Sequence, residues 1–572
     1  MQDIREKIFM VALRNAVEHG GKAAANSVLS KILGEDVLLR PKARELKQVV
    51  AEVVDEVNAL DLETQKRILV ERYGEPSKKP TVVEERRLPE LPAAQRGRVV
   101  TRLPPEPSGY MHLGHAIAGL INEYYARHYH GKLWLRFEDT NPRKANLVYY
   151  DSFRKGYRWL GIEWDYEKNN SDDMEKYYEY ATALIRRSVL YPCFCSAEQM
   201  HYQRATASIC EHRNMPTDES LEIWDKVLAG HYREGEISFR LRGVHDSPNT
   251  ALRDPVMFRI VDHPHPLKGR DYRLWPTYDF AAAVQDALCG VTHVLRSSEF
   301  AFRDELQNMI RSFLNLPNPV YVEFARFEFR GVTTSKREIR SLIEKGIVTG
   351  WDDPRLSTIE AVKRRGIRPE TLREFTYSYA GVSTAKKEYD WSLLHSINRK
   401  ILDPLAQRYF FVIDPVKVEL INAEPKEVEI PFHPSADFGK RIIKVKDTVY
   451  ISRRDTQALR PGSVFRCKLY ANIKLIEKYD DRLVGEVISG PPLKEGLIIQ
   501  WVSEENTEVK VLRYGDLFAV DGSINRDSLW LEKGLGEKAV ESVPFDGVVQ
   551  FERYGFVRRD SREEPIFVFC HE

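Results

Sequence analysis

The chain has 572 residues, with 86 lysines and arginines against 85 aspartates and glutamates, and about 150 residues per domain predicts three to five domains. Apolar residues make up 42% and charged residues 30%, which is ordinary for globular proteins and excludes collagen-like and wholly disordered chains. No stretch approaches the ~18 apolar residues of a membrane helix, and Met1 to Gly20 has no signal-peptide core. We therefore expect a cytoplasmic protein that binds no membrane.

The first 75 residues are predicted to be helical. Apolar residues recur there at steps of three and four, as in Ile4, Ile8 and Val11, which is the period of one helix face. Residues 76–98 are rich in proline and charge and have no period, so they are interpreted as a linker. Residues 1–75 therefore form a helical N-terminal appendage, a candidate for binding a protein partner.

An alternating α/β pattern begins near Val99. The run VVTRL is a short strand, PPEPSG breaks it, residues 112–130 have helical apolar spacing, and LWLRF is a second strand. Strand, turn, helix and strand in this order predict a doubly wound parallel sheet, in which ligands bind at the carboxyl ends of the strands.

The α/β pattern is interrupted and then resumes. Residues 191–270 lose the alternation, and FAAAVQDAL, VTHVLR, residues 304–314 and VYVEFARFEF then predict helix, strand, helix and strand. We expect the catalytic sheet to comprise 99–190 and 271–345, with 191–270 as an insertion.

The remainder of the chain divides into a helical and a β-rich part. A helical region is predicted from Pro369 to about Pro404, within a connecting segment 346–415. Beyond it, short alternating runs such as VKVELI, LVGEVIS and EVKVLRY are separated by turn residues. That spacing is typical of β-barrels, which we expect over 416–572.

A first motif, HLGH, lies where the first strand turns into the first helix. A helix start presents unpaired N–H groups and positive potential, so it attracts phosphate. His112 and His115 add directed donors, while Gly109 and Gly114 let the backbone approach a nucleotide closely. The alternative is that two histidines merely decorate a helix start.

A second motif, TTSKR, follows the last predicted strand. Lys336 and the hydroxyl of Ser335, on a loop that begins with glycine, would hold leaving phosphates as a mobile charge. The alternative is a solvated surface turn.

Together the two motifs resemble the HIGH and KMSKS signatures of class I aminoacyl-tRNA synthetases. RLPPEPSGYMHLGHA, LRFEDTNPRK, WLGIEW, YPCFCSAEQ, PTYDFA, DALCGVTHVLRSSEF and TTSKR occur in the order of the glutamyl and glutaminyl branch. The chain is identified as a member of this family, of the archaeal or eukaryotic glutamyl type. It departs from the family at Thr333, where the signature has lysine, so the charge of this loop rests on Lys336 with help from Arg337.

The resemblance implies a multidomain fold and an activity. The fold would be a Rossmann-type catalytic domain with an inserted acceptor-binding domain, a helical connecting domain and anticodon-binding barrels. The activity would be ligation of L-glutamate to tRNA(Glu) through a glutamyl-adenylate, with Mg-ATP as cofactor. By resemblance, catalysis involves His112, His115 and Lys336, and these three bind ATP together with Gly114 and Ser335.

The preference for glutamate is assigned by resemblance to Arg296, which would face the side-chain carboxylate. A guanidinium pairs with a carboxylate but finds no counter-charge on an amide, and an uncompensated buried charge costs about 3–5 kcal/mol. Without the resemblance, an ion pair with Glu299 or Asp304 would explain Arg296 better. The further expected substrate contacts are Arg102, Glu106, Glu138 and Tyr278.

A metal site is predicted in the insertion. Cys193 and Cys195, then Cys210 and His212, form two close pairs of the ligands that suit tetrahedral zinc. We expect one structural zinc ion with no catalytic role; free thiols are the alternative.

Three other functions compete with this interpretation. They are a glutaminyl-tRNA synthetase, a small adenylyltransferase that shares the HxGH motif, and a catalytically inactive relative that binds tRNA. The sequence also leaves open whether tRNA(Gln) is charged with glutamate in addition to tRNA(Glu).

Overall fold

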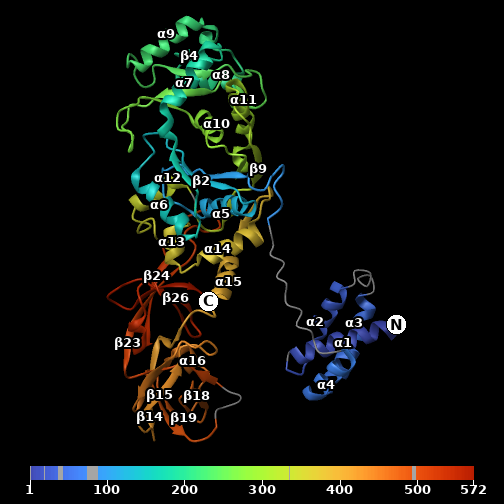
Figure 1. Ribbon diagram of the computed structural model, residues 1–572. Coiled ribbons are helices and arrows are strands. Elements are labelled where there is room, and N and C mark those ends of the chain that lie inside the picture. The colour runs from blue at the N-terminus through green and yellow to red at the C-terminus, as the bar shows by residue number, and fades with distance from the viewer. Residues whose placement is uncertain (1, 19, 36–42, 74–87, 334, 492–496) are drawn as a thin grey trace. The chain divides into compact units, whose positions relative to one another are not determined.

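The computed structural model describes residues 2–18, 20–35, 43–73, 88–333, 335–491 and 497–572 (Figure 1). The chain forms two compact units, Met1–Arg86 and Arg87–Glu572. Of the predicted linker, residues 76–87 lie outside the described part of the chain. None of the described helices has the length and apolarity that crossing a bilayer requires.

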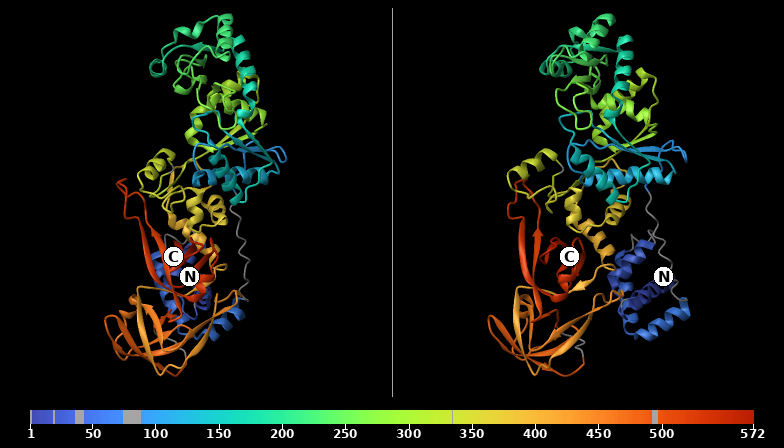
Figure 2. Two further views of the ribbon diagram at one scale, coloured as in Figure 1. Left: turned by 90° about the vertical axis from the view of Figure 1, so that its left-hand side faces the viewer. Right: turned by 60° about the vertical axis from the view of Figure 1, so that its left-hand side comes forward.

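The N-terminal unit is helical, as its apolar period predicts. The helices described in this unit gather into one bundle in each view (Figures 1 and 2), and a shared apolar core includes Ile8, Val28, Val53 and Leu69. Asn58, the last residue of α3, joins this helix to the segment before α2, because its side chain accepts from the backbone N–H of Ala23 and donates to the carbonyl of the same residue. The helices are α1 (Gln2–Glu18), α2 (Ala25–Glu35), α3 (Ala43–Asn58) and α4 (Leu62–Tyr73).

A parallel sheet begins the second unit. Strand β2 lies between β1 and β3, both parallel to it, and β8 pairs in parallel with β9. The backbone N–H of Thr292, just before β8, donates to the carbonyl of Val100 in β1 at 3.0 Å, which places β8 beside β1. The strands are β1 (Val100–Leu103), β2 (Lys132–Phe137), β3 (Tyr166–Asn169), β8 (His293–Ser297) and β9 (Val320–Phe324).

Helix α5 (Leu113–His128) covers this sheet, packing on β1, β2 and β8. It begins where predicted, because the proline-rich turn after β1 cannot extend the strand and His112 caps the first helical turn. The apolar core beneath α5 continues into the connecting helices, so the catalytic and connecting parts share one core. The connecting helices are α13 (Ile359–Arg364), α14 (Pro369–Phe375) and α15 (Trp391–Leu402), and α6 (Leu147–Trp159) of the catalytic part contributes to the same core. The buried residues of α12 (Lys336–Glu344) belong to a separate cluster.

Two predicted elements differ in the structure. The run VYVEFARFEF is two strands, because the chain bends after β9 where the N–H of Ala325 donates to the carbonyl of Ser383, and β10 (Phe327–Phe329) pairs with β11 (Lys387–Tyr389) instead. The helix predicted from Pro369 to Pro404 is interrupted between α14 and α15, where Gly381 adopts φ +62° and β11 follows.

The segment expected as an insertion forms an antiparallel sheet in the order β4-β5-β6-β7. Its apolar core is continuous with helices from both flanking segments, so this part does not have a separate core. The strands are β4 (Leu190–Cys193), β5 (Ser238–Leu241), β6 (Val256–Ile260) and β7 (Leu274–Pro276), and the helices in or beside this part are α7 (Met174–Arg186), α8 (Ala197–Thr206), α9 (Thr217–Leu228), α10 (Tyr278–Leu288) and α11 (Asp304–Leu314).

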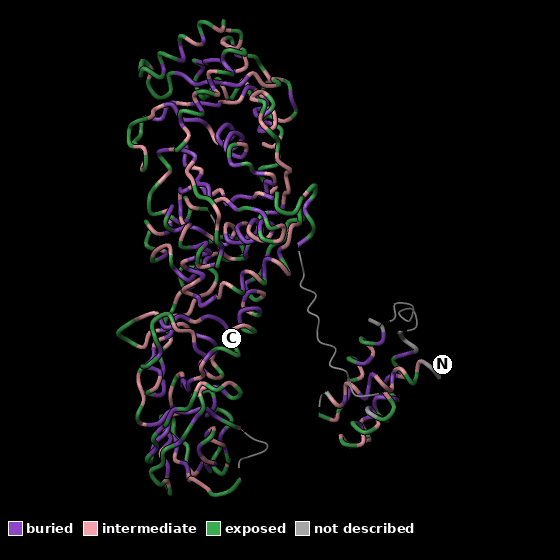
Figure 3. Tube along the Cα trace, in the orientation of Figure 1, coloured by how far each residue is buried: buried purple, intermediate pink, exposed green. Residues whose placement is uncertain are grey.

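Most strands of the described residues after α15 belong to two seven-stranded sheets. Buried and exposed stretches alternate along their strands (Figure 3), as in β14, where Val416, Val418 and Leu420 face inward. One sheet has the order β12 (Arg408–Tyr409), β25 (Val548–Phe551), β26 (Gly555–Arg559), β27 (Ile566–His571), β23 (Asn506–Tyr514), β24 (Leu529–Glu537) and β13 (Phe411–Ile413). The other has the order β21 (Leu497–Ile499), β18 (Val464–Cys467), β19 (Ala471–Lys478), β20 (Arg482–Ile488), β14 (Pro415–Ile421), β17 (Thr448–Ser452) and β22 (Val502–Ser503). The remaining elements are the hairpin of β15 (Lys426–Pro431) with β16 (Lys440–Val445) and the short helix α16 (Arg453–Thr456).

A buried ion pair joins this hairpin to the first of these sheets. Arg441 Nε and Nη2 donate to the two carboxylate oxygens of Glu537 at 2.8 and 3.0 Å, and both side chains are almost fully buried. Removing either side chain should therefore lower the stability of the fold, because the remaining charge would stay in an apolar environment.

Replacing Glu537 by alanine should destabilise the C-terminal sheets by about 3–5 kcal/mol, since Arg441 would be left buried without a counter-ion. The matched control is Glu427→Ala, which breaks an exposed ion pair with Lys444 at 3.8 Å and should cost under about 1 kcal/mol. Differential scanning calorimetry of the full chain measures both. Equal shifts of the unfolding temperature would contradict the structural role given to the buried pair.

Candidate active site

A cavity of about 440 Å³ opens at the carboxyl ends of β1 and β8, beside the start of α5. Parallel sheets bind their ligands at this edge. Among the residues predicted from the two motifs and the substrate assignment, Gly109, Ser335 and Arg337 do not line it. The others that do are Arg102, Glu106, His112, Gly114, His115, Glu138, Tyr278, Arg296 and Lys336.

Both histidines of the first motif are held as neutral donors. The N–H of Gly114 donates to Nδ1 of His112 at 3.1 Å, and the N–H of His112 donates to Nδ1 of His115 at 3.3 Å. Burial, reinforced by the charge of Lys336, lowers the pKa of His112 to about 3, and burial holds the pKa of His115 well below its usual value. Because each Nδ1 accepts, the single ring proton lies on Nε2, and each ring offers one N–H donor.

Lys336 connects the two motifs across the cavity. Its Nζ donates to the hydroxyl of Ser108 at 2.9 Å, within the PPEPSG turn that precedes the histidines. A Cβ atom at position 109 would lie 2.5 Å from Cδ of Lys336, so glycine is required for the lysine stem to pass. The side chain of Lys336 therefore packs closely on the turn after β1.

Lys336 is the first residue of helix α12, although the sequence predicted it on a loop. The loop ends one residue earlier, because the Ser335 hydroxyl accepts from the N–H of Glu338 and caps the helix. A lysine at a helix N-terminus opposes the helix dipole, and burial lowers its pKa. A bound anion would relieve both penalties.

One buried carboxylate, that of Asp286, organises the opposite wall. It accepts from Arg136 Nη1 at 2.7 Å and from Arg311 Nη2 at 3.1 Å, and it lies 3.6 Å from Arg102 Nε. Arg102 also donates to the carbonyl of Leu295 at 3.0 Å. These arginines keep the pKa of Asp286 below its usual value in spite of its burial. Arg102 is thereby fixed in the cavity wall.

Glu138 stands at the same wall with a perturbed pKa. Its carboxylate accepts from Arg136 Nη2 at 3.3 Å. Burial nevertheless outweighs the attraction of Arg136 and Arg102 and raises the pKa of Glu138 to about 7. A carboxyl group with this pKa changes charge near neutral pH.

Arg296 lies in the cavity wall and is also ion-paired. Its side chain is 6% exposed and forms an ion pair with Asp304, while Nη1 donates to Gln307 Oε1 at 3.2 Å. Glu299, the other partner considered, pairs with Arg326 at 3.1 Å. The ion-pair interpretation and the cavity interpretation of Arg296 are thus compatible.

A short segment before α13 binds both motifs. The carbonyl of Ser357 accepts from the N–H of Leu113 at 2.9 Å, and the Ser357 hydroxyl donates to the carbonyl of Thr333 at 3.0 Å. Arg355 in turn donates to Ser528, at the start of β24, at 3.3 Å. The backbone of the active site is thus linked to the C-terminal sheets.

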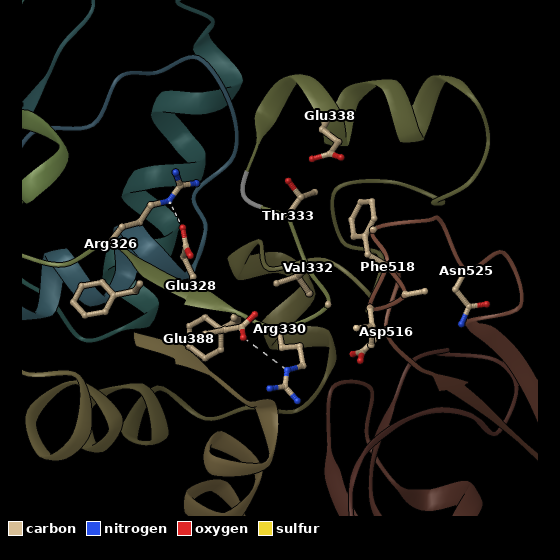
Figure 4. A pocket seen from close by; sticks show the side chains of 16 residues that line it. Arg326, Glu328, Arg330, Val332, Thr333, Glu338, Glu388, Asp516, Phe518 and Asn525 are labelled. Atoms are coloured by element: carbon tan, nitrogen blue, oxygen red, sulfur yellow. Dashed lines mark ion pairs between the residues drawn. The ribbon is translucent and has the colours of Figure 1, made fainter. Parts of the chain in front are cut away.

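A second cavity, of about 900 Å³, lies beside the loop of the second motif. Figure 4 shows Val332 and Thr333 on one side and Asp516 and Phe518, from the loop between β23 and β24, on the other. Gly331 has φ +72°, and a Cβ atom there would lie 2.5 Å from Cγ of Asp516. The C-terminal loop therefore approaches the motif closely.

The four predicted metal ligands lie together. The Sγ atom of Cys210 is 3.6 Å from those of Cys193 and Cys195 and 3.4 Å from Nδ1 of His212, and all four donor atoms lie within 4.8 Å of one another. Zinc–sulfur bonds of about 2.3 Å in a tetrahedron put sulfur atoms about 3.7 Å apart. The donor set fits a zinc ion in chemistry and in spacing.

Sequence reasoning missed several residues of the site. Ser108, Asp286, Gln307 and Ser357 touch or position predicted residues, but each acts through a partner distant in sequence. Asp286 had one usable signal, since it is an acidic residue near the end of a helix that is apolar except for Asp279, Gln285 and Asp286. The others carry no pattern that distinguishes them from surface polar residues.

The comparisons with known proteins cover nearly the whole chain. Residues 98–404 match the family of class I tRNA synthetases (E and Q), catalytic domain. Residues 406–490 and 498–560 match two models of the anticodon-binding domain of the same class.

The relatives compared over their full length are both glutamate–tRNA ligases. The chain is 39% identical to the glutamate–tRNA ligase of Pyrococcus furiosus over 584 residues, with 100% of both chains covered. It is 39% identical to the glutamate–tRNA ligase of Nitrosopumilus maritimus, with 99% of both covered. A solved glutamate–tRNA synthetase of Elizabethkingia anophelis is 17% identical at a TM-score of 0.42, covering 54% of this chain and 71% of that one, a likeness too slight to argue from.

Proposed function

Because the chain belongs to the class I tRNA synthetases of the E and Q family, we propose that it ligates L-glutamate to tRNA(Glu) with ATP, through a glutamyl-adenylate. The observation that carries this proposal is one cavity with two chemically distinct ends. Neutral histidines and Lys336 stand at one end, and the guanidinium groups of Arg102 and Arg296 stand at the other. Phosphate and an acidic side chain are the ligands that these ends suit.

The first step is attack by the α-carboxylate of glutamate on the α-phosphate of ATP, which releases pyrophosphate. No protein nucleophile is needed, so the residues act by positioning and by stabilising charge. His112 and His115 donate Nε2–H to phosphate oxygens beside Gly114, and Lys336 neutralises the departing pyrophosphate. Ser335, which lies outside the cavity lining, would support ATP binding by fixing the start of the helix that carries Lys336. Mg²⁺, when bound with ATP, would supply further neutralisation of the phosphates.

The substrate assignments follow from the charges of the other wall. Arg296, with Arg102, would bind the side-chain carboxylate, and ionised Glu138 would bind the α-ammonium group. Tyr278 and Glu106 line the same cavity and would complete the substrate site. In the second step a hydroxyl of the terminal ribose of tRNA takes the glutamyl group and releases AMP.

Acceptance of tRNA(Gln) as a second acceptor stays a prediction, as does a protein partner for the N-terminal helices. The runner-up function is a glutaminyl-tRNA synthetase, and Arg296 speaks against it, since an amide offers this guanidinium no counter-charge. Aminoacylation of both purified tRNAs with labelled glutamate and labelled glutamine separates these possibilities.

Arg296→Ala should lower the preference for glutamate over glutamine by about 10²–10³-fold, because the charge that favours the acidic substrate is removed. Aminoacylation of tRNA(Glu) with each labelled amino acid gives the ratio of kcat/KM values. Arg330→Ala, which alters an exposed arginine paired with Glu388 and Asp390, is the control and should leave the ratio unchanged. A native chain that prefers glutamine, or forms no product with either amino acid, would refute the proposed function.

The KM for glutamate should rise as the pH is lowered from 8 to 6. With the pKa of Glu138 near 7, the carboxylate that binds the α-ammonium group is present above that pH and is lost as protons bind below it. The rise approaches about tenfold per pH unit below 7, whereas kcat at saturating glutamate stays nearly constant. Steady-state kinetics measure both, and Glu138→Gln should give a high KM that no longer depends on pH. A flat KM in the native chain would contradict the role of Glu138.

We further propose one structural zinc ion bound by Cys193, Cys195, Cys210 and His212. Two contacts from neighbouring side chains support thiolate ligands: Gln203 Nε2 lies 3.4 Å from Sγ of Cys195, and Arg240 Nη1 lies 3.8 Å from Sγ of Cys193. Four protein ligands leave no open position, so the ion would stabilise this part of the fold rather than catalyse.

Metal analysis of the purified protein should find about one zinc per chain, the number that a single four-ligand site takes. Cys210→Ser should abolish zinc binding and lower the unfolding temperature, because the free energy of metal binding that stabilises the fold would be lost. Cys289→Ser, which removes a buried thiol outside the cluster, should retain the metal. Protein that holds no zinc and takes up none on addition would disprove the site.

A further inference from the structure

We propose that Asp304 is a positioning residue for substrate selection, which holds Arg296 in the orientation that recognises the substrate's side-chain carboxylate. The inference rests on the proposed function and deepens it. Asp304 pairs with Arg296 at the edge of the cavity, and it does not itself line the cavity.

The guanidinium of Arg296 lies beside two aromatic rings. Its carbon is 5.0 Å from the ring centre of Tyr321 and 5.8 Å from that of Phe300. Contacts with aromatic rings do not fix the direction of the N–H groups in the plane of the guanidinium. The in-plane direction of the N–H groups must therefore be set by hydrogen-bond and ion-pair partners at the edge of the group.

Two side chains of helix α11 supply those partners. Asp304, the first residue of the helix, forms an ion pair with Nη2 of Arg296. Gln307, one turn later, accepts a hydrogen bond from Nη1. The helix is itself fixed, because Leu306 and Ile310 are buried in the core shared with the insertion. Arg296 is thus oriented by a rigid element and not by a mobile loop.

The orientation of Gln307 is set in turn. Its Nε2 donates to Asp279 Oδ1 at 3.2 Å, which leaves Oε1 to face Arg296. Asp279 is paired with Arg303. The polar groups beside Arg296 therefore form one continuous chain of contacts.

Arg296 keeps N–H groups for a ligand, because a guanidinium has five N–H donors and Asp304 and Gln307 contact it only at Nη2 and Nη1. Its Nε is buried and has no hydrogen-bond partner among the residues that the structure describes. A buried donor without a partner is costly, and a substrate carboxylate in the cavity would satisfy it. Because Asp304 and Gln307 each hold one terminal nitrogen, they set the direction of the remaining N–H groups.

A residue that orients Arg296 should affect the kinetics differently from a residue that only neutralises its charge. Without Asp304, Arg296 would keep its charge but lose its fixed direction, so glutamate would have to order it on binding. The loss should appear in the KM for glutamate and in the choice between glutamate and glutamine. The turnover of bound substrate should be little affected, because Arg296 is assigned to the side-chain carboxylate of the substrate and not to the reacting α-carboxylate or phosphate.

The test compares Asp304→Ala with Glu305→Ala, the adjacent carboxylate in the same helical turn, which binds Asn249 instead. Asp304→Ala should raise the KM for glutamate about tenfold and lower the glutamate preference by a similar factor, with kcat changed less than about twofold. The KM for ATP should stay constant. Glu305→Ala should match the native chain, and Asp304→Glu should restore part of the preference.

An unchanged or lower KM for glutamate in Asp304→Ala overturns the inference, and a lower value would show that Asp304 competes with the substrate. If this variant does not fold, Asp304→Asn takes its place with the same expected results. Arg296→Ala separates the two proposals. Should it retain the glutamate preference, Arg296 is not the selecting residue and the positioning role fails with it, while glutamate ligation by the native chain still stands; should it lose the preference while the Asp304 variants keep theirs, the positioning role alone fails.

Discussion

A carboxylate among three guanidinium groups is the interaction on which the substrate end of the cavity depends. Asp286 is 2% exposed and contacts Arg102, Arg136 and Arg311. Each arginine would be costly to bury alone, and the shared carboxylate makes their burial possible. Because Arg136 also binds Glu138, the same network orients both the cationic and the anionic side chains that face the ligand.

Much of the fold was readable from periodicity, since local patterns reflect local structure. The helix after the PPEPSG turn, the helix at 304–314 and the strand VTHVLR were each predicted within about two residues. The run VYVEFARFEF was misread, because alternation alone does not show where a strand leaves one sheet for another. Lys336 was placed on a loop for a related reason: a cation is a poor signal for a helix start.

The candidate site was readable to a lesser degree, and the difference follows from the distance between its parts along the chain. Residues within a motif identify one another by spacing, as His112 and His115 do. The hydrogen bond from Lys336 to Ser108 spans 228 residues, and the one from Arg355 to Ser528 spans 173. Such partners become apparent only when the fold brings them together, which is why the orienting residues emerged from the structure and the chemically reactive ones from the sequence.

Leu517, in the loop between β23 and β24, is fully buried against Ile339 and Leu342 of the helix that Lys336 begins. A shortened protein that ended near residue 404 would uncover this apolar side of α12 to water. The matched catalytic region is therefore not an autonomous module, even though the family boundary at 404 suggests a natural place to divide the chain. A fragment that ends there should be poorly soluble. Fusing an unrelated domain after α15 would leave the apolar side of α12 exposed in the same way.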